Sequence, residues 1–190
     1  MDLPIYRHTK SELPVCVDLM QPHEATGVRE MLNQIVLDGV SYPQSAPLSV
    51  EAFANYWLKG EAFVVRLPAP ADVNNSAQVV GAFYLKPNFP GRCSHIGNAG
   101  FIVTPQMRGQ GLGRLMGEVM LDVARDRGYR AVMYNLVFET NVPSLKLWQS
   151  LGFHEIGRVP QAAYLPDGRY VDAVMLYKSL VEEEGRRVEG

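Results

Sequence analysis

A glycine-rich segment in the second half of the chain combines residue types that can bind an anion. Arg108-Gly109-Gln110-Gly111-Leu112-Gly113 follows a short apolar run at 100–103 and precedes apolar residues at helical spacing. Glycines let the backbone approach a ligand closely, and the free N–H groups of a helix N-terminus together with its dipole attract negative charge. Arg108 and Arg114 add charged donors. The segment therefore predicts a site for a phosphate-bearing ligand.

Two nucleotide-binding motifs fit this segment less well. A nucleotide P-loop requires Gly-Lys-Ser/Thr, whereas Gly113 is followed here by Arg114-Leu115. A dinucleotide fingerprint can use Gly109 and Gly111, but its third position then falls on Arg114 rather than on Gly or Ala. From the glycine spacing alone, an ordinary glycine-rich turn remains the alternative to an anion site.

Two motifs in this half of the chain resemble the signatures of the GNAT superfamily of N-acetyltransferases. Residues 103–113 are similar to the acetyl-CoA signature R/Q-x-x-G-x-G/A, and Asn141-x-x-Ser144-x-x-Leu147-Trp148 followed by Gly152-Phe153 resembles N-x-x-A-x-x-L-Y with a later G-F. The resemblance implies an acyltransferase with acetyl-CoA as co-substrate. It also implies the cofactor-binding residues, which are Ile102, Val103, Arg108, Gly109, Gln110, Gly111, Leu112, Gly113, Arg114, Asn141, Ser144 and Trp148.

Shorter stretches carry a narrower resemblance. Tyr42-Pro43-Gln44, Asn98-Ala99-Gly100-Phe101, the run at 83–89 and the run at 135–138 look like the fungal L-azetidine-2-carboxylate N-acetyltransferases, which acetylate the ring nitrogen of proline-like imino acids. The similarity runs from residue 42 to about residue 177 and does not include the first forty residues. It implies direct acetyl transfer to a small imino acid. Two alternatives stay open: a GNAT enzyme for another small primary amine, and a non-catalytic acetyl-CoA-binding module.

The narrower resemblance implies roles for three residues. Asn98, Phe101 and Asn135 are expected to contact the substrate, and Asn135 is also the candidate catalytic residue, as a donor to the developing oxyanion. A neutral amide suits this work because it donates without titrating. The alternative for Asn135 is a core amide whose hydrogen bonds are satisfied by neighbouring backbone.

The residues expected to move protons depart from the superfamily pattern. Many GNAT enzymes carry Tyr at the position of Trp148, and an indole N–H is not a practical acid. No general base stands out, since Glu139 and His95 both have ordinary explanations as surface residues. Tyr84 and Tyr134 are predicted to be core residues with hydrogen-bonded hydroxyls.

The order of the predicted elements is mixed α/β (α+β). Strands are expected at 15–20, 62–67, 79–86, 100–103, 131–138, 153–159 and 170–177, and helices at 22–38, at 49–58, from 109–113 to 128, and after Asn141. The resemblance implies a GNAT fold, with a mixed, mostly antiparallel sheet of about six to seven strands flanked by helices and two splayed central strands. We expect one N-acetyltransferase domain at 1–180 and a charged C-terminal tail at 181–190.

Composition narrows the possible partners. The net charge of −2 and the pI of about 6.1 provide no general attraction to nucleic acid or an anionic membrane. Two cysteines and the absence of a secretory signal predict a cytoplasmic location, and the four histidines have no metal-ligand spacing, so no metal is expected. The predicted partner is a small-molecule amine or imino acid. Relatives of this type imply a homodimer.

Overall fold

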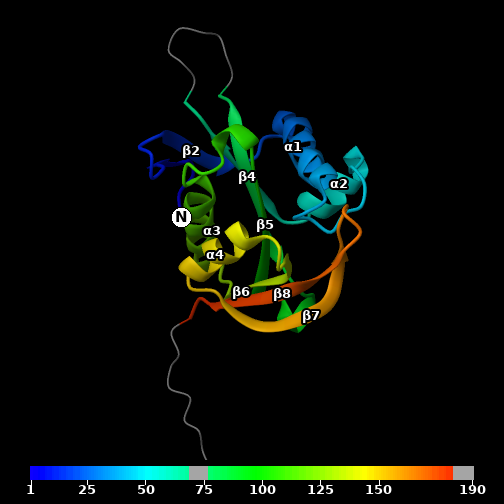
Figure 1. Ribbon diagram of the computed structural model, residues 1–190. Coiled ribbons are helices and arrows are strands. Elements are labelled where there is room, and N and C mark those ends of the chain that lie inside the picture. The colour runs from blue at the N-terminus through cyan, green and yellow to red at the C-terminus, as the bar shows by residue number, and fades with distance from the viewer. Residues whose placement is uncertain (69–76, 182–190) are drawn as a thin grey trace, which may run out of the picture.

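The computed structural model describes residues 1–68 and 77–181, and a single mixed sheet runs through them (Figure 1). The strands lie in the order β1-β2-β3-β4-β5-β6-β8-β7, and of these neighbouring pairs β5 and β6 are parallel while the others are antiparallel. The strand bounds are Ile5–His8 for β1, Pro14–Leu19 for β2, Glu61–Arg66 for β3, Val79–Pro87 for β4, Ile96–Val103 for β5, Ala131–Phe138 for β6, His154–Tyr164 for β7 and Tyr170–Ser179 for β8.

This sheet confirms the predicted mixed, mostly antiparallel architecture but has eight strands rather than six to seven. The missed strand is β1, which pairs with β2 at the edge of the sheet. Ile5 is the one buried residue in β1, so the strand has no alternating apolar pattern that a sequence could reveal.

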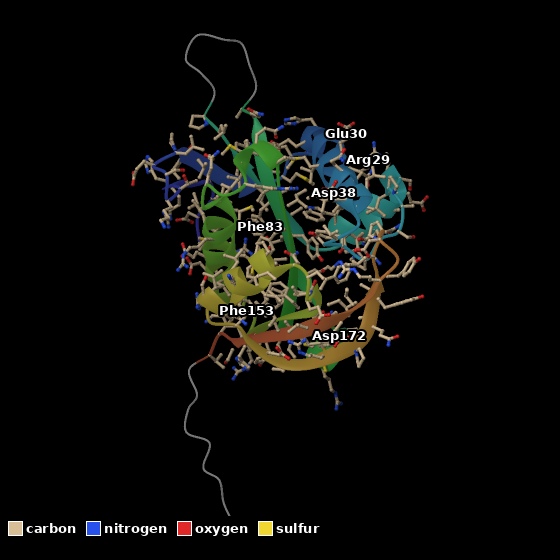
Figure 2. The ribbon with its side chains drawn as sticks, viewed as in Figure 1. Arg29, Glu30, Asp38, Phe83, Phe153 and Asp172 are labelled. Atoms are coloured by element: carbon tan, nitrogen blue, oxygen red, sulfur yellow. The ribbon has the colours of Figure 1, made fainter. Side chains whose placement is uncertain are left out.

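Helices cover both faces of the central strands (Figure 1). α1 (Ala25–Asp38) and α2 (Val50–Trp57) pack on one face, where Leu32 and Trp57 are fully buried with Ala82 of β4. α3 (Leu112–Asp126) and α4 (Val142–Ser150) cover the other face, where Phe83 lies at the centre of the molecule (Figure 2) and packs in one cluster with Met116. Alternate residues of β4 therefore point into two separate cores.

The helix ends follow the sequence predictions. The Ser49 hydroxyl accepts a hydrogen bond from the Ala52 N–H, Asn141 accepts one from the Ser144 N–H, and Gly39 ends α1 with a φ of +69°. The predicted strand at 100–103 was too short, because β5 begins at Ile96. Asn98, predicted to lie in a loop, is therefore part of a central strand.

The two central strands separate partway along their length, as the resemblance implied. β5 and β6 pair at Ile96 with Ala131 and at Gly97 with Val132, and no further pair forms between these two strands. Since β4 and β8 hold the outer edges of β5 and β6, the sheet stays continuous while a gap opens at its centre.

Three short 3-10 helices complete the described elements: Pro22–Glu24, Gly91–Cys93 and Pro105–Met107. Among the helices of residues 1–68 and 77–181, none is long and apolar enough to cross a membrane. The predicted charged tail falls almost entirely at 182–190, outside the described residues, and the single-domain boundary at 180 stays a prediction.

Candidate active site

A cleft of about 990 Å³ lies where β5 and β6 separate. Its lining comes from both faces of the sheet, so the cleft passes through the gap between the two strands. Most of the residues predicted from the sequence line it: Asn98, Phe101, Ile102, Val103, Arg108, Gly109, Gly111, Leu112, Gly113, Asn135, Asn141, Ser144 and Trp148.

Two predicted cofactor residues lie outside this cleft. The Gln110 side-chain amide donates to the carbonyl of Gln106, and the Arg114 guanidinium pairs with Glu118 at 2.9 Å. Both side chains point along the surface of the loop and of α3. The contacts of these two side chains with the cofactor stay predictions.

The glycine loop takes conformations that other residues rarely adopt. Gly109 has a φ of +78° and Gly111 a φ of +84°, and Gly111 is the N-cap of α3. The left-handed conformation turns the chain sharply and leaves the first N–H groups of α3 open to the cleft. A helix N-terminus of this geometry suits an anion, and the predicted anion site stays a prediction.

The exposed edge of β5 presents free backbone groups to the gap. Asn88 N–H donates to Ile96 O, and Thr104 N–H donates to Val80 O, so the even-numbered residues of β5 pair with β4. In an antiparallel ladder the intervening residues point their N–H and C=O groups the other way. Phe101 and Val103 therefore present backbone groups to the cleft, whereas the backbone N–H and C=O of Ile102 hydrogen-bond to β4 within the sheet.

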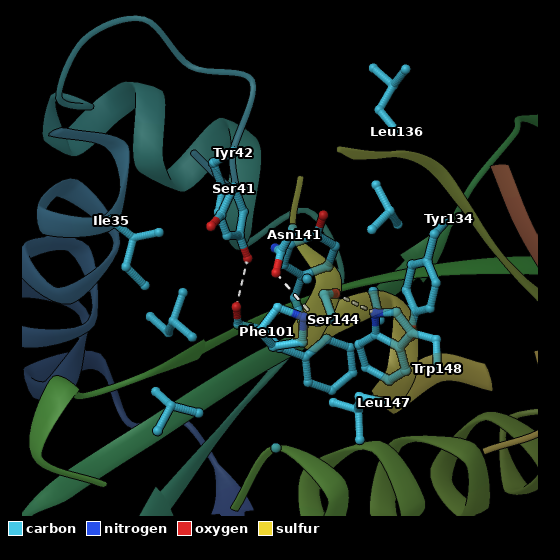
Figure 3. Close-up of a pocket in the computed structure, with 18 of the residues that line it drawn as sticks. Ile35, Ser41, Tyr42, Phe101, Tyr134, Leu136, Asn141, Ser144, Leu147 and Trp148 are labelled. Atoms are coloured by element: carbon cyan, nitrogen blue, oxygen red, sulfur yellow. Dashed lines mark hydrogen bonds between the residues drawn. The ribbon is translucent and has the colours of Figure 1, made fainter. Parts of the chain in front are cut away.

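The second signature holds Trp148 in a fixed position (Figure 3). The Trp148 indole N–H donates to the Ser144 hydroxyl at 2.9 Å, and the ring lies 4.8 Å from Phe101 and 4.6 Å from Tyr134, measured between ring centroids. The side chain is 5% exposed. Its single donor is occupied, so Trp148 forms an aromatic wall of the cleft rather than an acid.

Two tyrosines cover β5 on the face that carries α1. The Tyr42 hydroxyl donates to the Phe101 carbonyl at 3.0 Å (Figure 3), and the Tyr84 hydroxyl donates to Asn98 Oδ1 at 3.2 Å. Gly100 makes room for both, because a Cβ there would lie 2.5 Å from Tyr84 Cε1 and 3.1 Å from Tyr42 Oη. Asn98 in turn donates to the Met133 carbonyl at 2.9 Å, which bridges β5 and β6 where they part.

Asn135 projects from an irregularity in β6. The register between β6 and β8 shifts between Tyr134 and Val137, which inserts one extra residue and leaves Asn135 exposed. Bulges of this kind re-aim side chains next to active sites. Because Asn135 is exposed, the alternative of a buried core amide is excluded.

Lys86 is a cation inside the cleft that the sequence analysis did not single out. Its ammonium group donates to the Tyr56 carbonyl at 2.8 Å and lies 4.8 Å and 4.4 Å from the ring centroids of Tyr56 and Tyr84. Burial lowers the pKa of Lys86, and the charge of Lys59 lowers it further. The aromatic rings hold the charge in place.

The remaining sequence candidates lie elsewhere. His95 and Glu139 do not line the cleft, and the Glu139 carboxylate accepts from the Asp172 N–H at 3.2 Å and from Arg158 at 3.4 Å. Tyr42 and Lys86 belong to the short runs that carry the narrower resemblance, but their residue types alone indicate no functional role. Tyr84 has the predicted hydrogen bond, whereas the prediction for Tyr134 was wrong: its buried hydroxyl has no partner among the described residues.

The splayed sheet, the glycine loop at a helix N-terminus and the cleft between them define an acetyltransferase. The chain belongs to the acetyltransferase (GNAT) family, whose model matches residues 31–153. Its fold and its cleft are those of this acetyltransferase family.

Individual relatives agree with this family. The chain is 43% identical over 111 residues to N-acetyltransferase aca1 of Schizosaccharomyces pombe, a match that covers 56% of this chain and 53% of that protein. The chain thus spans about half the length of this relative. A GCN5-related N-acetyltransferase from Kribbella flavida is 31% identical, with a TM-score of 0.78 and coverage of 87% of this chain and 97% of that one.

A more distant structure shares the fold. The phosphinothricin acetyltransferase of Sinorhizobium meliloti, solved in complex with AcCoA, is 17% identical, with a TM-score of 0.77 over 93% of this chain and 94% of that one.

Proposed function

We propose that this chain transfers the acetyl group of acetyl-CoA to the nitrogen of a small acceptor that carries a carboxylate, a proline-like imino acid such as L-azetidine-2-carboxylate. Lys86 is the observation that carries the proposal. A half-buried ammonium beside the reaction gap favours an anionic acceptor, because a charge partly shielded from water gains more from an opposite charge than from a neutral group.

The acetyl donor fits the other side of the cleft. The N–H groups at the start of α3 and Arg108 suit a pyrophosphate. The N–H of Phe101 and the backbone groups of Val103 suit the amides of the pantetheine arm, as an added strand would, while the Phe101 carbonyl already accepts the Tyr42 hydroxyl. Trp148 lies beside this path and would pack against the arm. The thioester then reaches the gap between β5 and β6.

The transfer itself needs few groups from the protein. The neutral acceptor nitrogen forms a bond to the thioester carbonyl carbon and loses its N–H proton to solvent. The carbon–sulfur bond breaks, and the sulfur leaves with the electron pair as a thiolate. Asn135 supports the step as a donor to the oxyanion, an interaction whose loss costs about 3–4 kcal/mol of barrier in comparable sites. Asn98, whose amide already bridges Tyr84 and Met133, supports the substrate site by orienting the strands around it.

A comparison of acceptors tests this proposal. Release of coenzyme A thiol is followed with L-azetidine-2-carboxylate, with azetidine, which lacks the carboxylate, and with primary amino acids. We expect Lys86→Met to raise the KM for the carboxylate acceptor about 10- to 100-fold, the range of a charged hydrogen bond. Lys178→Met, at a half-buried lysine of β8 outside the cleft, is the matched control and should leave KM unchanged.

Each alternative has its own outcome. Equal rates with azetidine and its carboxylate would remove the proposed role of Lys86. Release with primary amines alone would point to a different GNAT acceptor, and acetyl-CoA binding without release by any acceptor would indicate a non-catalytic module. The cytoplasmic location and the homodimer stay predictions.

A further inference from the structure

Tyr134 carries a buried hydroxyl that the fold leaves unused. The residue lies in β6 and is 5% exposed, and its hydroxyl oxygen has no hydrogen-bond partner in residues 1–68 and 77–181. Buried polar groups in native proteins are nearly always paired, so an exception calls for a ligand or a role in chemistry. Tyr134 also lines the cleft.

The side chain lies on the face of the sheet that receives the acetyl donor. It packs in the same apolar cluster as residues of α3 and α4, and its ring lies beside that of Trp148 (Figure 3). The ring centroid of Tyr134 is 4.6 Å from that of Trp148 and 4.9 Å from that of Phe153. Tyr84 and Trp57 belong to the opposite cluster, on the α1 face. Tyr134 therefore faces the cleft from the side of the glycine loop, whereas Lys86, held between the rings of Tyr56 and Tyr84, approaches it from the acceptor side.

Position along the strand places this hydroxyl at the reaction gap. Met133, the preceding residue, accepts the Asn98 hydrogen bond that marks where β5 and β6 part, and Asn135 follows at the bulge. A pantetheine arm paired with Phe101 and Val103 would extend along β5 toward this part of the gap. Trp148, next to Tyr134, has its only donor committed to Ser144.

We propose that the Tyr134 hydroxyl donates a hydrogen bond to the thioester sulfur as it becomes the thiolate, and so acts as a catalytic residue in place of the tyrosine that Trp148 replaces. The inference rests on the proposed acetyl transfer but not on the identity of the acceptor. As the carbon–sulfur bond breaks, the sulfur keeps the electron pair, Tyr134 keeps its proton, and the N–H proton of the acceptor goes to solvent. A donor that strengthens only as charge develops on sulfur lowers the barrier.

The environment of Tyr134 suits a neutral donor. Burial raises the pKa of Tyr134 well above its usual range, and repulsion from Tyr42 raises it further. The phenol therefore stays protonated wherever the enzyme is folded, and it has an O–H to donate at every pH of interest.

Tyr134→Phe tests the proposal by removing only the hydroxyl. We expect kcat to fall about 10- to 100-fold with little change in the KM for acetyl-CoA, while the thermal unfolding temperature stays equal or rises because an unpaired buried group has gone. Tyr177→Phe, at a half-buried tyrosine of β8 outside the cleft, is the control and should leave kcat within twofold.

A second readout needs no acceptor. Free coenzyme A is bound to each protein and its thiol is titrated by the ultraviolet absorbance of the thiolate. The acid dissociation constant of the bound thiol should be about tenfold larger in the wild type than in Tyr134→Phe. Equal constants in the two proteins, or an unchanged kcat, would overturn the proposal. Because this titration is independent of the acceptor, it keeps its meaning if the imino-acid assignment fails.

Discussion

The side-chain amides of Asn88 and Asn135 hydrogen-bond to each other in both directions, at 2.9 Å and 2.7 Å. Asn88 directly follows β4, and Asn135 lies on the bulge of β6, so the pair spans the gap from one strand to the other. Each amide uses one N–H in the pair and keeps a second for another acceptor. The reciprocal bond thereby fixes the direction in which the remaining N–H of Asn135 points.

Asn135→Ala is expected to lower kcat about 100-fold or more while acetyl-CoA still binds, because it removes the proposed oxyanion donor. Asn88→Ala should lower kcat less, by about tenfold, since Asn135 keeps its donor but loses its orientation. The double variant should resemble Asn135→Ala, because Asn88 acts through its partner. Steady-state kinetics on the three variants measures this, and additive losses would show that the two amides act separately.

Gly100→Ala is expected to disrupt the acceptor face of β5. The new Cβ would lie 2.5 Å from Cε1 of Tyr84, which is 3% exposed and has no room to move. We expect about 1–3 kcal/mol of destabilisation and about a 100-fold loss of kcat, since displaced tyrosines would move the substrate. Urea unfolding and kinetics measure the two effects.

Gly27→Ala is the control for that substitution. Gly27 lies in α1, where an added Cβ would meet nothing within 4 Å. Alanine there should stabilise the protein by about 0.5–1 kcal/mol and leave kcat unchanged. A similar loss of stability and of kcat in both variants would mean that the surroundings of Gly100 do not require a glycine.

Gly111→Ala is expected to weaken acetyl-CoA binding about tenfold. Gly111 has a φ of +84°, and a Cβ would lie 3.1 Å from Lys10 Cβ, so the loop would shift away from the start of α3. The strain should cost about 1–3 kcal/mol of stability. Gly91 also has a positive φ, of +57°, but lies outside the cleft. Gly91→Ala should therefore lower the stability of the protein without changing its affinity for acetyl-CoA. Calorimetric titration distinguishes the two.

Arg66→Met is expected to change how stability depends on pH. Arg66 pairs with Glu24 at 2.7 Å and with Asp18 at 3.2 Å. Although burial raises the pKa of Glu24, its hydrogen bonds with Arg66 and the Gln21 backbone and the charge of Arg66 outweigh this and hold the pKa below its ordinary value of 4.5. The unfolded chain therefore binds this proton first as pH falls, so the stabilisation is present above 4.5 and is lost as pH falls through the folded pKa.

The variant should be less stable by about 1–3 kcal/mol near neutral pH, because it leaves a nearly buried carboxylate without its cation. The difference from wild type should narrow as the pH falls below 4.5, where Glu24 becomes neutral. Urea unfolding across this range measures both. A difference that stays constant with pH would contradict the assignment of the linkage to Glu24.

Features that depend on neighbouring residues were predictable from the sequence. The starts of α2 and α4, the end of α1 and the strand Ala131–Phe138 all lie where the local pattern indicated. Each depends on hydrogen bonds or apolar spacing within a few residues, so local composition carries the information. The glycine loop was predictable for the same reason.

Tertiary structure alone decided how the chemical groups of the site meet. Asn88 and Asn135 are 47 residues apart, and Tyr42 and Phe101 are 59 apart. Three features arise from strand register and from packing between distant segments: the bulge that exposes Asn135, the contact of Lys86 with two aromatic rings, and the Tyr134 hydroxyl, which is buried without a partner among the described residues. No local pattern encodes such contacts, because the same residues in the same order would behave differently with another register.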